Sequence, residues 1–137
     1  MKKSVQVSIE SYSDGQEISQ KAQGDLYRKG DHYYLRYEET EAEMRGTVTT
    51  VKLEQARIRI VRSGAIRSEQ EFIVGKSCQG IYETPQGRMG LETVTHAMYY
   101  DWSDGLGTVE WSYDLFVMGD PAGRYRLRFH IAERQLS

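Results

Sequence analysis

The feature that most limits the fold of this chain is a strict alternation of apolar and polar residues, clearest in "RYRLRFHI" near the carboxyl end. One set of alternate positions holds Tyr125, Leu127, Phe129 and Ile131, and the other holds three arginines and a histidine. Successive side chains of a β-strand point to opposite faces, so this pattern predicts a strand with one buried face and one wet face. A helix would space its apolar residues three and four apart instead.

The same period of two recurs along most of the chain. Further strands are predicted in "SVQVSIES", "HYYLRYEE", "TVTTVKLE", "ARIRIVRS", "AIRSEQEFIVG", "SCQGIYE", "LETVTHAMYYDW" and "GTVEWSYDLFVMG". A weaker strand, "EISQKAQGDLYR", has an inward face of Ile18, Ala22, Gly24 and Leu26, and its small residues favour a sharp bend or close packing. Turn signals separate about ten strands. The best helical candidate, residues 38–46, is more typical of a charged loop because its only large apolar residue is Met44.

Many short strands without a long crossover predict an all-β fold. A sandwich and a barrel both fit the strand spacing. Consecutive hairpins favour a meander, and closing a meander of eight to ten strands removes its exposed edges. We therefore expect residues 1–137 to form one domain, a single antiparallel up-and-down β-barrel of eight to ten strands.

Charge and cysteine content narrow the classes of function and partner. The chain has 18 basic and 20 acidic residues, a net charge of −2, which gives no general attraction to nucleic acid or to an anionic membrane. Cys78 is the only cysteine, so an internal disulfide is excluded. The amino terminus lacks the apolar stretch of a secretory signal, and we expect a cytoplasmic protein. His32, His96 and His130 have no metal-ligand spacing, so no metal or cofactor is predicted.

Several segments in order resemble the YwiB-like family of small uncharacterised bacterial proteins, from about Ser4 to Ile131. They are "YYLRYEE", "TVTTVKLEQARIRIVRSG", "FIVGKSCQGIYETPQGRMGLET" and "GTVEWSYDLFVMGDPAGRYRLRFHI". The markers are an Arg-x-Gly turn at Arg62, the turn from Tyr82 to Gly87, and a Tyr-x-Leu strand at Tyr113. The resemblance implies a calycin-like, lipocalin-like barrel and implies no activity or catalytic residue.

Arg62 is the first candidate ligand-binding residue. It continues the apolar face of Ala56, Ile58 and Ile60 just before a glycine turn, so its side chain is expected to point inward. An inward arginine keeps its charge and needs acceptors. We expect an ion pair with an acidic residue such as Glu71, and the alternative is an anchor for a carboxylate or phosphate inside the barrel.

The stretch "YETPQG" supplies the next candidates, Tyr82 and Thr84. Pro85 presets the first corner of a turn and Gly87 can adopt a positive φ, so hairpin mechanics alone account for the Thr-Pro-x-Gly part. The functional alternative is a loop at the barrel mouth that offers the hydroxyls of Tyr82 and Thr84 to a ligand.

Tyr113 belongs to a set of tyrosines that we expect to be mostly core filling, with the option of lining a polar-aromatic cavity. The set is Tyr33, Tyr37, Tyr82, Tyr99, Tyr100, Tyr113 and Tyr125. We expect His96 to be packed on one strand face with Val94, Met98 and Tyr100, and Cys78 to be a small buried residue.

The basic residues that alternate through the last strand could follow a phosphate backbone, but a cross-strand ladder of ion pairs fits better. The strip consists of Arg124, Arg126, Arg128 and His130, and its expected partners are Glu110, Ser112 and Asp114.

These observations favour a non-catalytic barrel that binds a small molecule in or at the mouth of the barrel. A rival is a protein-interaction or homodimerising module that uses the barrel exterior. An enzyme acting through Arg62, Glu71 and Tyr82 is the third hypothesis, ranked last because no nucleophile–base pair is visible. Nucleic acid and membrane are not expected as partners.

Overall fold

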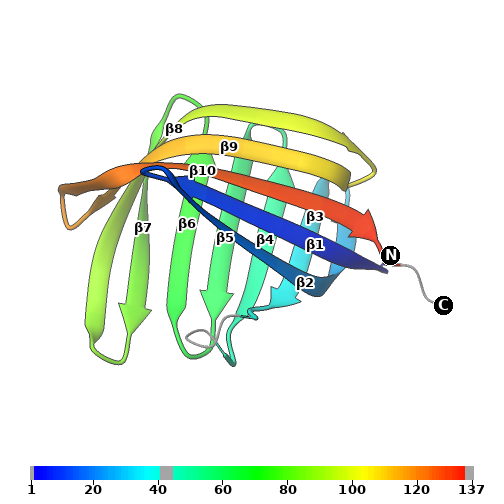
Figure 1. Ribbon diagram of the computed structural model, residues 1–137, viewed down its shortest axis with the longest axis horizontal. Helices are drawn as coiled ribbons and strands as arrows, with labels where there is room; N and C mark the ends of the chain where they lie inside the picture. Colours follow the sequence, from blue (N-terminus) through cyan, green and yellow to red (C-terminus); the bar gives the residue numbers. More distant parts are fainter. Residues whose placement is uncertain (1, 41–44, 135–137) are drawn as a thin grey trace.

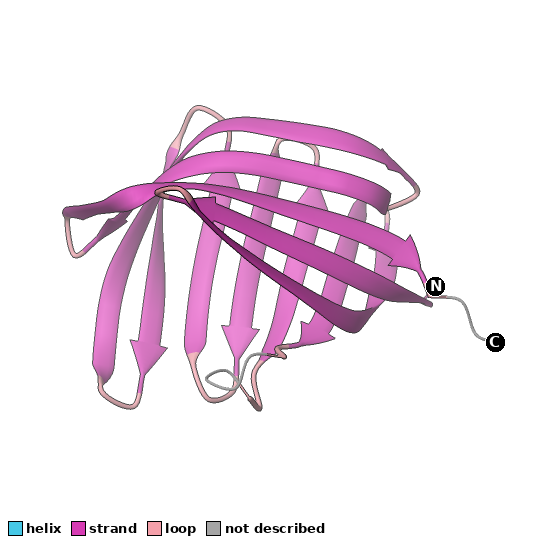
Figure 2. Cartoon of the chain, in the orientation of Figure 1, coloured by secondary structure: helices cyan, strands magenta, loops and turns pink. Residues whose placement is uncertain are grey.

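The computed structural model describes residues 2–40 and 45–134, and over these residues the chain forms ten β-strands and no helix (Figures 1 and 2). The strands are β1 (Lys2–Ser13), β2 (Gln16–Lys29), β3 (His32–Glu38), β4 (Val48–Glu54), β5 (Arg57–Ser63), β6 (Arg67–Ile73), β7 (Ser77–Thr84), β8 (Gly87–Ser103), β9 (Leu106–Val117) and β10 (Asp120–Glu133). Residues 41–44, part of the predicted charged loop, lie outside the described residues.

The strands close into a barrel in the order β1-β10-β9-β8-β7-β6-β5-β4-β3-β2. Each strand pairs antiparallel with its neighbour in sequence, and β1 pairs with β10 to close the ring. The predicted up-and-down antiparallel barrel is therefore confirmed. No helix in the described residues is long and apolar enough to cross a lipid bilayer.

The barrel interior is filled by the alternating apolar residues. Trp111 and Phe129 are each 1% exposed and Tyr113 is 5% exposed, while Leu127 packs partly buried against them. Phe72 lies at the centre, with ring centroids 5.4 Å from Trp111 and 4.7 Å from Tyr113 in tilted contacts. Burying a large apolar side chain stabilises the fold by about 1.5–3 kcal/mol, so this aromatic group is a main source of stability.

The barrel wall has two seams, where at least one of the neighbouring strands extends well beyond the paired residues. β2 pairs with β3 through residues 24–29 only, and β6 pairs with β7 through residues 67–69 only. A glycine marks each seam: a Cβ on Gly24 would lie 2.5 Å from the Arg36 carbonyl oxygen, and one on Gly80 would lie 2.3 Å from the Glu69 carbonyl oxygen. The close packing predicted near Gly24 is confirmed.

Two side chains that were predicted to be packed are exposed. Ile18 is 58% exposed because the tip of the β1–β2 hairpin extends beyond the packed interior. His96 is also exposed, because it follows the buried Thr95 and lies on the outer face of β8. The β8–β9 register then shifts between Thr95 and Ala97, and this β-bulge turns Met98 and Tyr100 to the inner face, away from His96. The His96 ring instead bonds the Asp114 carboxylate on the outer surface, with Nε2 and Oδ2 2.9 Å apart.

The outer face of β9 and β10 carries the predicted charge ladder. Arg124 lies opposite Asp114 and its Nε donates to the carboxylate at 2.9 Å, while Arg126 lies 3.6 Å from Glu110. His130 bonds Thr108 at 3.0 Å. These arginines therefore have protein partners on the adjacent strand.

Candidate functional site

A row of polar side chains crosses the inner face of the barrel at one end. The register places Tyr37 opposite Thr49, Thr49 opposite Arg62, Arg62 opposite Ser68, and Ser68 opposite Tyr82. In an up-and-down barrel the end of β3, the start of β4, the end of β5 and the start of β6 meet at the same end, so these residues come together there. We call Tyr37, Glu39, Thr49, Arg62 and Ser68 the mouth cluster.

Arg62 points inward as predicted and has a carboxylate partner, but the partner is Glu39. The Arg62 Nε lies 3.5 Å from Glu39 Oε1, and the Thr49 hydroxyl donates to the same oxygen at 2.7 Å. The Glu39 side chain is only 1% exposed, whereas the Arg62 side chain is 21% exposed. From the neighbouring strand β2, the Gln20 side-chain amide nitrogen lies 3.5 Å from the second carboxylate oxygen of Glu39.

Glu71, the partner proposed from sequence, lies on the other side of the barrel wall. It sits opposite Arg59 in the β5–β6 register, on the outer face, and its carboxylate bonds Arg57 at 2.8 Å. The expected Arg62–Glu71 pair is wrong because Glu71 falls on the outward phase of β6, between the inward Gln70 and Phe72. The structure does not bring Glu71 into the mouth cluster.

The segment from Tyr82 to Gly87 ends β7, makes a tight turn and begins β8. Pro85 and Gln86 form the turn, and the Gln86 backbone N–H donates to the Thr84 hydroxyl at 3.2 Å. Gly87 adopts a φ of 150°. The Thr84 hydroxyl is thus part of the turn itself, whereas Tyr82 belongs to the inner row next to Ser68.

Two buried tyrosines, Tyr37 and Tyr113, lie within the electrostatic reach of Arg62. Burial raises the pKa of Tyr37, the Glu39 carboxylate raises it further, and the Arg62 charge opposes both effects. Burial likewise raises the pKa of Tyr113, and Arg62 again opposes the shift. Tyr113 stacks on Tyr125 with centroids 5.6 Å apart. In contrast, Tyr99 is 61% exposed and is not part of the core.

Ser68 is 1% exposed, and its hydroxyl has no hydrogen-bond partner among the described residues. Burying a hydroxyl without a partner costs free energy, so such groups are uncommon unless something else supplies the bond. Ser68 lies on the strand beside Arg62 and faces the same interior. The pair therefore presents unused hydrogen-bonding capacity in one place.

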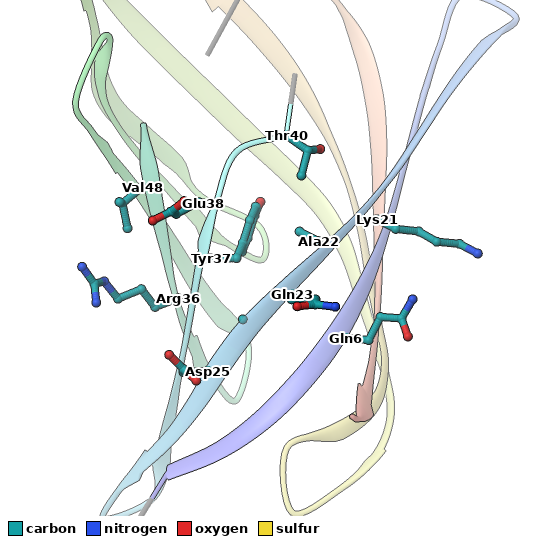
Figure 3. A pocket seen from close by; sticks show the side chains of 11 residues that line it. Gln6, Lys21, Ala22, Gln23, Asp25, Arg36, Tyr37, Glu38, Thr40 and Val48 are labelled. Carbon is teal, nitrogen blue, oxygen red and sulfur yellow. The ribbon is translucent and has the colours of Figure 1, made fainter. Parts of the chain in front are cut away.

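A groove of about 630 Å³ opens at the β2–β3 seam, and Figure 3 shows the side chains that line it. β2 continues past the end of β3, which leaves the space between them unfilled. Tyr37 belongs to both the groove and the mouth cluster. Thr40 lines the groove and bonds Gln20, which in turn contacts Glu39 of the mouth cluster. The remaining lining residues are Gln6, Lys21, Ala22, Gln23, Gly24, Asp25, Arg36, Glu38 and Val48.

Sequence reasoning missed Glu39, Thr49 and Ser68. A signal for Glu39 was present, since it continues the inward face of Leu35 and Tyr37 just as Arg62 continues that of Ile58 and Ile60. Thr49 likewise alternates with buried Val51 and Leu53. Nothing in the sequence pairs these residues, because the pairing depends on the cross-strand register.

The geometry defines a closed ten-stranded antiparallel barrel with a polar mouth and a groove beside it. The model of the family DUF1934, which is described as a domain of unknown function, matches residues 4–129. The chain therefore belongs to this family. The chain is 29% identical over 109 residues to the uncharacterized beta-barrel protein YwiB of Bacillus subtilis (strain 168), covering 80% of this chain and 76% of that protein. The crystal structure of the ywiB protein from Bacillus subtilis matches with a TM-score of 0.80 and 21% identity over 98% of this chain and 94% of that chain. The family resemblance and the barrel fold are thereby confirmed.

Proposed function

We propose that this protein binds a small organic ligand at the mouth of the barrel without catalysing a reaction on it. The observation that carries the proposal is the groove of about 630 Å³, a volume typical of small-molecule sites, which adjoins a cluster of buried polar groups. Binding sites in barrels of this size commonly lie at the mouth. The calycin-like barrel that the family resemblance implies agrees with this role, but this is an argument from fold alone.

In this proposal Arg62 anchors an acidic group of the ligand. The one described polar contact of Arg62 joins its Nε to Glu39 Oε1 over 3.5 Å, which is long for a hydrogen bond. The two terminal amino groups of the guanidinium therefore remain for another acceptor. Those groups suit the two oxygens of a carboxylate or a phosphate. The unpartnered Ser68 hydroxyl beside Arg62 would donate to the same acid, and Tyr82 and Tyr113 border the position.

The titratable groups of the mouth cluster support a holding role. The Glu39 carboxylate is occupied by Thr49, Arg62 and Gln20, and burial favours the protonated forms of Tyr37 and Tyr113. A general base needs a free acceptor and a pKa near the working pH. The Glu39 carboxylate already accepts from its neighbours, and the raised pKa values of Tyr37 and Tyr113 keep these two hydroxyls protonated.

The test is native mass spectrometry of the protein purified from its own host, followed by thermal-shift measurements with a library of organic acids and matched uncharged amides. We expect a retained small molecule, or a rise in melting temperature, that is specific to acids. The change Arg62→Met should abolish it, and Arg62→Lys should weaken it because lysine lacks the planar fork.

The matched control is Arg59→Met. Arg59 lies on the same strand as Arg62 but faces outward and pairs with Glu69 at 3.0 Å. This variant should keep the ligand response. An empty mass spectrum together with no melting shift for any acid would contradict the proposal, as would an equal loss of response in the two methionine variants.

A further inference from the structure

Among residues 2–40 and 45–134, no strand pairs with one edge of β2 over the first half of that strand. Residues 16–23 pair with β1 on one side, while the pairing of β2 with β3 begins only at Gly24. In the described part of the chain, the backbone hydrogen bonds formed outside the strand pairs do not involve these eight residues either. An unpaired edge presents backbone donors and acceptors that can pair with another strand. Figure 1 shows this half of β2 crossing the front of the barrel beside β1.

The outward side chains on this edge include exposed groups of opposite charge. Glu17 and Lys21 share the outward face, are separated by four residues, and form no ion pair with any described residue. Ile18, on the other face, is 58% exposed, which is unusual for a large apolar residue in this protein. The edge thus combines free backbone groups, complementary charges and an uncovered apolar side chain.

We propose that two copies of this chain pair through the free edges of β2, antiparallel and related by a two-fold axis at Ser19. In that register Glu17 of each copy lies opposite Lys21 of the other, so the pairing forms two symmetric ion pairs. The two Ile18 side chains lie diagonally across the axis and cover each other. The second copy is the partner that fits because a two-fold interface must be complementary to itself, and the order Glu17, Ser19, Lys21 has that property.

The interface is small, because the free edge spans only eight residues. Small interfaces give weak and transient complexes, so the dimer should form and dissociate with concentration. The mouth groove lies along this same edge, since Lys21 and Gln23 line it, so the second strand would occupy part of the groove. The pairing itself does not depend on any ligand.

Sedimentation equilibrium of the full chain, from micromolar to millimolar concentration, tests the proposal. We expect the mass to rise from 15.8 kDa toward twice that value. Glu17→Lys places like charges opposite each other at two symmetric positions and should weaken association about tenfold or more. The double variant Glu17→Lys with Lys21→Glu reverses both charges, restores the complementarity, and should return the dissociation constant to within about threefold of the original.

The control is Asp101→Lys, which makes the same change of charge at an exposed position on β8. It should leave the association unchanged, and circular dichroism should show that all variants are folded. A chain that stays monomeric over the whole range would overturn the proposal. So would association that is indifferent to Glu17→Lys, or a double variant that is no better than the single one.

Discussion

The middle of the barrel and its mouth are built by the same strands but have opposite character. On β6, Phe72 is completely buried among aromatic rings, and Ser68, four residues earlier on the same inner face, is a buried hydroxyl without a partner. On β5, Ile58 is buried and Arg62 pairs with Glu39. Alternation therefore decides which residues face inward, but position along the strand decides whether the interior is apolar or polar. Stability should be concentrated in the middle and specificity at the mouth.

The largest expected effect comes from the middle. Phe72→Ala removes a fully buried ring that contacts Trp111 and Tyr113, and the free energy of unfolding should fall by about 3–5 kcal/mol through lost burial and a residual cavity. Urea denaturation measures it. Val74→Ala, at a position 39% exposed, is the control and should cost less than about 1 kcal/mol. Similar losses for the two variants would contradict the assignment of the core.

At the mouth, Arg62→Met should lower the free energy of unfolding by about 3 kcal/mol, because the nearly inaccessible Glu39 carboxylate loses its charged partner. Combining it with Glu39→Leu removes the stranded charge, and the double variant should recover at least about half of that loss. If the double variant is less stable than Arg62→Met alone, then Arg62 and Glu39 stabilise the fold by more than the neutralisation of each other's charge.

The β2–β3 seam gives a smaller effect. Gly24→Ala forces a Cβ against the Arg36 carbonyl oxygen and should destabilise the protein by about 2 kcal/mol through strain and backbone shift. Gly90→Ala is the control, since a Cβ there meets no atom within 4 Å, and it should change stability by less than about 0.5 kcal/mol. Equal melting temperatures for the two variants would show that β2 and β3 move apart at this seam without a cost in stability.

The smallest effect belongs to the outer wall. Bonds from Arg124 and His96 lower the pKa of Asp114 from 3.8 to about 2. Because the folded-state pKa lies below the unfolded value, this contribution is present above about pH 4 and is lost as the pH falls toward 2. Asp114→Asn should therefore reduce stability at pH 6 by less than about 1 kcal/mol, as for an exposed ion pair, and the difference should vanish near pH 2. A difference that persists at pH 2 would assign the effect to packing.

Local pattern was sufficient to predict the strands and most of the core. The failures came where a long-range feature shifted the pattern: the bulge at His96 reverses the phase of β8, and the extension of the β1–β2 hairpin leaves Ile18 without a neighbour to cover it. The inward direction of Arg62 was predictable, because it follows from counting residues along one strand.

The sequence by itself determined the alternating strands, the turns between them, and the inward charge at Arg62. Only the tertiary structure decided that Arg62 pairs with Glu39 instead of Glu71, and that a groove opens where β2 extends past the end of β3. The physical reason is one of range. The side-chain direction in a strand is fixed by its immediate neighbours, whereas partners across a sheet are fixed by how the closed ring of strands is staggered.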